Sequence, residues 1–258
     1  MMIFRRFLIC LLAFLFLLPQ LTKAQQYVTT IGIQYKPIIP FGFLRKDGFN
    51  TTVSPITASL QPKNGSSFGM VIRRGLNPRF SVESGINMTS RNYSLHVTVE
   101  DTSLTYDADF KWINYEIPVQ LLVFIRLGEQ LFINASGGFS FKFFPSDIET
   151  FHENFYQRTY RWSWIRPNLL ANLGFEWRTE KSGYFYLGAS YSQPFVDMAL
   201  TQIDYMGTNP RTQLFDGIRG NYLTLDLRYF FHEDPNRVTR KMLRDRRKRI
   251  DADRKARH

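Results

Sequence analysis

The chain has 258 residues, of which 44% are apolar and 16% aromatic, and its formal net charge is +11. Its one cysteine, Cys10, lies in the first 24 residues, so disulfides and thiol chemistry are excluded for the rest of the chain. No later apolar run is long enough for a membrane-spanning helix. The composition therefore favours one large β domain.

Residues 1–24 have the pattern of a secretory signal peptide. Two arginines precede an apolar run at 7–18, and Thr22 and Ala24 supply the small residues of a cleavage site. This apolar run of 12 residues is too short to cross a bilayer as a helix. We expect export of the chain and a mature protein that begins at Gln25, with a retained N-terminal anchor as the alternative.

Eight segments of the remaining chain alternate apolar and polar residues with a period of two, which indicates strands with two different faces. The clearest is 130–144, where the odd positions from Leu131 to Phe143 are apolar or small. The eight segments are 26–37, 66–74, 78–91, 108–126, 130–144, 160–178, 183–193 and 219–231.

Short and long connections alternate between these segments. The short ones are 75–77, 127–129 and 179–182, and the long ones are 38–65, 92–107, 145–159 and 194–218. Short periplasmic turns and long external loops are typical of an outer membrane barrel. The pattern predicts an all-β fold, an eight-stranded antiparallel up-and-down transmembrane β-barrel over 25–231. The alternative is a soluble β-sandwich, in which the apolar faces would point inward.

If the apolar faces contact lipid, the opposite faces carry charges of both signs into the lumen. These residues are Lys36, Glu83, Glu116, Lys142, Glu176, Asp226 and Arg228. A barrel of eight strands has room only for its own side chains, and charges buried there have to pair. We expect an ion-paired plug and no open pore. Aromatic girdles at the strand ends are expected from Tyr27, Tyr35, Tyr93, Trp112, Trp162, Trp164, Trp177, Tyr184 and Tyr229.

Several segments resemble the outer-membrane β-barrel domain family common in Bacteroidota, which includes PorT-like and OmpA-like small barrels. The resemblance rests on 115–122 (YEIPVQLL), 135–138 (ASGG), 187–192 (LGASYS) and the aromatic closing strand 222–231, and it covers most of 25–231. It implies a barrel in the cell outer membrane and no shared catalytic residues. The chain departs from the family by continuing beyond the closing strand.

This extension, 232–258, contains eleven Lys or Arg and five Asp or Glu, a net charge of +6. Asp234 followed by Pro235 is a helix-start signal, so we expect a basic helical tail on the periplasmic side. Its expected partners are anionic lipid, cell-wall polymer or an envelope protein. Nucleic acid is not expected, because the chain is exported and the tail has no aromatic residues for base stacking. The alternative is a solvated extension without a partner.

Two histidines in predicted external loops are the candidates for catalysis. They are His96, with Ser94, Ser103, Glu100 and Asp101 nearby, and His152, with Glu149 and Glu153. These residue types are ordinary in polar loops, and no metal-ligand or phosphate-binding motif is present, so we predict no enzyme activity, cofactor or metal. The expected function is a structural or interaction role in the cell envelope. The alternatives are a component of a transport or secretion system and, less favoured, a membrane-embedded hydrolase or acyltransferase.

Overall fold

The structure, a computed structural model, describes residues 29–41, 47–77, 79–100, 102, 104–152, 154–179, 182–208 and 211–231. The predicted signal peptide and basic tail lie outside these residues. Within them, no helix is long and apolar enough to cross a membrane. The strands are β1 Thr29–Ile39, β2 Phe49–Val53, β3 Ile56–Gly75, β4 Phe80–Val99, β5 Thr105–Arg126, β6 Leu131–Phe143, β7 Ile148–His152, β8 Phe155–Arg161, β9 Ile165–Arg178, β10 Tyr184–Pro194, β11 Ala199–Tyr205, β12 Thr212–Ile218 and β13 Tyr222–Phe230.

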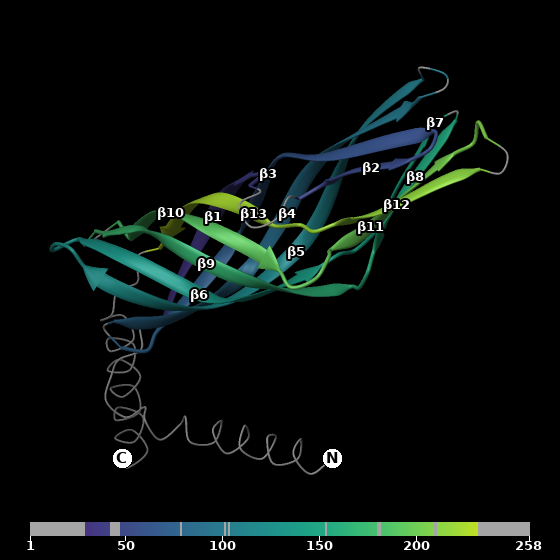
Figure 1. Ribbon diagram of the computed structural model, residues 1–258. Coiled ribbons are helices and arrows are strands. Elements are labelled where there is room, and N and C mark those ends of the chain that lie inside the picture. Colours follow the sequence, from purple (N-terminus) through teal and green to yellow (C-terminus); the bar gives the residue numbers. More distant parts are fainter. Residues whose placement is uncertain are drawn as a thin grey trace, which may run out of the picture.

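Two antiparallel sheets contain all of these strands (Figure 1). The larger sheet has nine strands in the order β1-β13-β10-β9-β6-β5-β4-β3-β2, and β1 also pairs with β3. Because β1 is paired with β13 at one edge and with β3 at the other, this sheet curls round on itself. The second sheet has four strands in the order β12-β11-β8-β7.

The prediction of a simple eight-stranded barrel is wrong. Each of the eight predicted segments contains a strand of the larger sheet, but the described residues form 13 strands. The five additional strands are β2, β7, β8, β11 and β12, and they lie in stretches predicted as loops. The short connections are tight turns as predicted: the amide of Leu76 donates to the carbonyl of Phe80 at 2.9 Å, and that of Thr179 donates to the carbonyl of Gly183 at 3.0 Å.

Near these tight turns, the outer face of the larger sheet is apolar. Along β9, Leu169, Leu173, Phe175 and Trp177 are exposed, Leu173 to 60%. The same holds for β1, β6, β10 and β13, for β3 from Phe68, for β4 up to Met88 and for β5 from Ile113. We call these outward side chains the apolar belt. A soluble sandwich, with its apolar faces inward, is therefore excluded for this half of the molecule.

The direction of the apolar face inverts further along β4 and β5. In β4 the inward residues are polar as far as Arg91 and apolar from Tyr93 onward. In β5 the inward residues Phe110 and Trp112 are apolar, and the outward apolar residues begin at Ile113. Tyr93 and Trp112 are thus buried in a core, and their predicted place in a girdle is wrong. Tyr35, Trp162, Trp164 and Trp177 are exposed, Tyr184 and Tyr229 are partly exposed, and Tyr27 is outside the described residues.

Beyond the inversion, the two sheets enclose a separate hydrophobic core. We call this half the distal domain, which consists of β2, β7, β8, β11, β12 and the adjoining parts of β3, β4 and β5 (Figure 1). Its core contains Ile56, Ala58, Leu60, Tyr93, Leu95, Val97, Val99, Tyr106, Phe110, Trp112, Phe144, Phe155, Met198, Ala199, Ile203, Tyr205, Leu214 and Ile218. The predicted external loops are therefore largely a folded domain, because their apolar residues continue the alternation in the opposite phase.

Candidate functional site

A chain of ion pairs fills the lumen inside the apolar belt. Glu83 accepts hydrogen bonds from Arg73 Nε at 3.1 Å and Nη2 at 3.0 Å, and it also pairs with Arg228. Arg228 Nη2 donates to Asp226 at 2.6 Å, and Lys36 Nζ lies 3.5 Å from the same carboxylate. All five side chains are at most 9% exposed. The predicted pairing of lumen charges is confirmed for Lys36, Glu83, Asp226 and Arg228.

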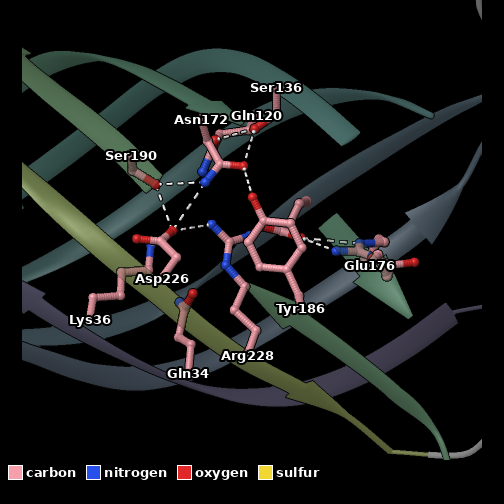
Figure 2. A network of polar contacts seen from close by, with 12 residues as sticks. Gln34, Lys36, Gln120, Ser136, Asn172, Glu176, Tyr186, Ser190, Asp226 and Arg228 are labelled. Atoms are coloured by element: carbon pink, nitrogen blue, oxygen red, sulfur yellow. Dashed lines mark hydrogen bonds and ion pairs between the residues drawn. The ribbon is translucent and has the colours of Figure 1, made fainter. Parts of the chain in front are cut away.

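Neutral side chains connect this network across neighbouring strands (Figure 2). Ser190 Oγ donates to Asp226 Oδ2 at 2.6 Å, and Asn172 Nδ2 donates to the same oxygen at 3.2 Å. The hydroxyl of Tyr186 donates to Asn172 Oδ1 at 2.7 Å. Asp226 is thus held by neutral side chains of β9 and β10 as well as by its two cations, and such connected hydrogen bonds restrict the movement of a buried carboxylate.

Sequence reasoning missed two cations of this network, Arg73 and Arg178. Arg73 pairs with Glu176 as well as Glu83, and Arg178 Nε donates to Glu176 at 2.6 Å. A signal for Arg73 was present, because it has the parity of the polar residue Ser67 on the inward face of β3. Which lumen cation pairs with which carboxylate cannot be predicted from this alternation, since Arg73 and Glu176 are 103 residues apart in sequence.

A second set of polar contacts lies where the lumen meets the distal domain. Arg91 Nη2 donates to Asp47 Oδ2 at 2.5 Å, and the amide of Gly220 donates to Asp47 Oδ1 at 2.7 Å. Arg91 Nη1 also donates to the carbonyl of Gly220 at 3.2 Å. Gly220 has a φ of +91°, a backbone conformation that residues other than glycine rarely adopt. These contacts tie the link before β2 to the link before β13 and close the lumen at this level.

Two predicted lumen charges, Glu116 and Lys142, are buried side by side without forming an ion pair within the described residues. Lys142 Nζ instead contacts Ser192 Oγ at 3.0 Å and lies 4.2 Å from the ring centre of Tyr222. A cavity beside Glu116, Lys36 and Tyr222 has a volume of only about 10 Å³, enough for about one water molecule. The lumen is filled by side chains at this level as well.

The structure gives His96 different partners from those predicted. Its Nδ1 lies 2.5 Å from Asp107 Oδ1, and Ser59 is opposite it in register on the other side. This row of Ser59, His96 and Asp107 is on an exposed sheet face, and within the described residues Ser59 and His96 form no hydrogen bond. The predicted neighbour Ser94 lies in the next row, beside Asp109, while Asp101 and Ser103 lie outside the described residues. This geometry has no activated serine.

His152 is likewise separated from its predicted partner. Glu149 forms an ion pair with Arg158, whose Nε lies 2.7 Å from Oε1 of the carboxylate, and the His152 ring packs beside Tyr106 with ring centres 5.1 Å apart. Glu153 lies outside the described residues. Nowhere in the described part of the chain do three His, Cys, Asp or Glu side chains come together to hold a metal ion.

The antiparallel sheet that curls round a polar lumen and carries an apolar outer face defines the class of outer membrane β-barrel folds. Among solved structures, the crystal structure of the outer membrane protein OprG from Pseudomonas aeruginosa has a TM-score of 0.51 and 14% identity, covering 80% of this chain and 96% of that one. Two autotransporter structures also match. The β-domain of the Bordetella autotransporter Brka has a TM-score of 0.25 and 8% identity, covering 81% of this chain and 100% of that one. The translocator domain of the autotransporter NalP from Neisseria meningitidis has a TM-score of 0.22 and 8% identity, covering 82% of this chain and 90% of that one. The likeness to OprG concerns the fold alone.

No protein-family model and no curated protein matches the chain. The resemblance to the Bacteroidota family therefore stays a prediction.

Proposed function

We propose that this protein spans the cell outer membrane through its apolar belt and holds the distal domain outside as a contact surface, with a structural or interaction role in the cell envelope. The observation that carries this proposal is the inversion of polarity in β4 and β5. A strand that is apolar outward up to Met88 and apolar inward from Tyr93 suits lipid on one part and water on the other.

The filled lumen argues against conduction. Ions would have to pass the Arg73–Glu83–Arg228 pairs, then the Arg91–Asp47 contact, and finally the apolar core of the distal domain. Each of these barriers consists of buried side chains that contact one another. We propose that the barrel is a closed support for the distal domain and not a channel.

The test is to refold residues 25–258 in detergent and compare gel migration with and without boiling. A folded barrel resists detergent until it is heated, so the unboiled band is expected to run faster than the boiled band. Equal migration, together with solubility in the absence of detergent, would refute the membrane assignment. Planar bilayer recordings of the same sample are expected to show no steady conductance, and a stable conducting state would favour the transport or secretion alternative.

The proposal includes no enzyme activity. The row of Ser59, His96 and Asp107 is the arrangement closest to a catalytic one among the described residues, and it is open to water. The backbone amides of β4 beside His96 are used in the pairing with β3 on one side and β5 on the other, so they are not free to stabilise an oxyanion.

Export through residues 1–24 and a periplasmic role for 232–258 complete the proposal. The tail's net charge of +6 supports binding to anionic lipid, cell-wall polymer or an acidic envelope protein. Removing 232–258 is expected to abolish periplasmic crosslinks of the protein while the gel shift remains. Unchanged crosslinks would leave the tail without a partner role.

A further inference from the structure

A groove of about 690 Å³ lies at the level where the outer face changes from apolar to polar. It is bounded by Pro40 after β1, by Pro62, Lys63 and Asn64 on β3, and by residues of β4 and β5. The register of β3 against β4 shifts between Lys63 and Ser66. Such a bulge bends a strand locally and re-aims its side chains.

The register of β4 and β5 gives the level of the groove relative to the apolar belt. On these strands Asn92 is opposite Lys111, and both line the groove. Lys111 is two residues from Ile113, the last belt residue of β5, which is about 7 Å along a strand. Lipid whose acyl chains cover Ile113 and Met88 therefore places its headgroup beside Lys111.

The charge of the groove is positive. Lys63 Nζ contacts both oxygens of Asp109, at 2.8 and 2.7 Å. Hydrogen bonds from Lys63 and Ser94 hold the pKa of the Asp109 carboxyl below its ordinary value, so this pair stays ionised and neutral in sum. Lys111 is exposed, and no carboxylate of the described chain lies within ion-pair distance of it. The groove thus has one cation without a counter-charge.

Amide groups complete the lining. Asn92 Nδ2 donates to the carbonyl of Asn64 at 2.8 Å, which fixes the bulged part of β3 against β4. The exposed side chain of Asn64 lies beside Lys63 and offers hydrogen bonds to a ligand. Lysine binds phosphate as a compact charge, and amides suit the oxygens around it.

We infer that this groove binds the phosphate of an anionic lipid headgroup, with Lys111 and Lys63 at the phosphate and the acyl chains on the neighbouring apolar belt. The inference rests on the proposed membrane orientation. A lipid is favoured over a free phosphate ion because Lys111, which lines the groove, is exposed on the same face of β5 as the belt residue Ile113 two positions further on, and a free ion would not use that apolar neighbour.

The test uses the refolded protein in phosphatidylcholine vesicles that contain a small fraction of either phosphatidic acid or diacylglycerol, which differ only in the phosphate. Enrichment of labelled lipid around the purified protein is expected with phosphatidic acid and not with diacylglycerol. Lys111→Gln is expected to weaken the enrichment about 5-fold and Lys63→Gln/Lys111→Gln about 30-fold, at about 1 kcal/mol for each lysine near a charged lipid surface. Arg211→Gln is the control, because Arg211 is an exposed cation of the distal domain outside the groove.

Equal enrichment of phosphatidic acid by the double variant and by the unchanged protein would overturn the inference. Displacement of the lipid by millimolar inorganic phosphate would also overturn it, because it would indicate a site for free anions. Every sample is also run on a gel without boiling. If the gel shift is present and the lipid preference is absent, only the groove assignment fails, and if the shift itself is absent, the proposed function fails.

Discussion

Replacing Glu83 with Gln tests whether the lumen is sealed from water. Glu83 is the shared counter-charge of Arg73 and Arg228, and all three side chains are at most 5% exposed. The connected network has four cations, Lys36, Arg73, Arg178 and Arg228, and three carboxylates, Glu83, Glu176 and Asp226. The substitution keeps the side-chain volume and raises the excess positive charge of this network from +1 to +2.

The expected loss of unfolding free energy is about 3–5 kcal/mol, the cost of leaving a buried charge without its partner. The lower end is favoured, because Arg73 keeps Glu176 and Arg228 keeps Asp226. The assay is urea unfolding of the protein in lipid vesicles, followed by tryptophan fluorescence and by the gel shift. Adding Arg228→Met to Glu83→Gln returns the excess charge to +1, so part of the stability is expected to return.

Asp109→Asn is the matched control. It makes the same carboxylate-to-amide change in the exposed Lys63–Asp109 pair, whose side chains are 48% and 66% exposed. Exposed ion pairs contribute little, so no measurable change is expected. A loss below about 1 kcal/mol for Glu83→Gln would refute the reasoning, since it would mean that water screens the lumen charges.

Three further outcomes are expected. Leu95→Ala, in the core of the distal domain, is expected to cost about 2–5 kcal/mol there and to expose β4 to protease while the gel shift persists. A Cβ at Gly188 would lie 2.2 Å from the hydroxyl of Tyr186, so Gly188→Ala is expected to destabilise the barrel by about 1–3 kcal/mol. Gly137→Ala is the control: its Cβ would meet its nearest neighbour at 4.0 Å, so no change in stability is expected. A fluorophosphonate probe is expected to leave Ser59 unlabelled, and labelling that His96→Ala abolishes would contradict the absence of enzyme activity.

The belt half of the fold could be predicted because apolar residues and polar residues each recur at every second position, in opposite phase. In β5 the odd residues from Ile113 to Ile125 are apolar, and the intervening residues include Glu116. The same parity placed Glu83, Asp226 and Arg228 in the lumen, where burial confirms them. Alternation within a strand is local, so it can be recognised without knowledge of the strand's neighbours.

The distal domain could not be predicted in the same way. Leu95, Val97 and Val99 alternate as regularly as the belt residues, but period two does not state which side of the strand faces water. The pairing of β11 with β8 joins segments that are far apart in sequence, with Thr159 opposite Thr201. The lipid groove depends on both kinds of information, because the bulge at Lys63 and the level of Ile113 emerge only when the strands are paired.

The continuity of β3, β4 and β5 has a mechanical consequence. These strands run from the tight turns into the distal domain without a linker, over 20, 20 and 22 residues. From Ile113 to Thr105 β5 extends about 27 Å past the belt, at a fixed tilt. A partner that binds the distal domain therefore meets a surface at a fixed height and angle relative to the belt. A force that pulls on the distal domain acts along the paired strands, so it loads their inter-strand hydrogen bonds in shear.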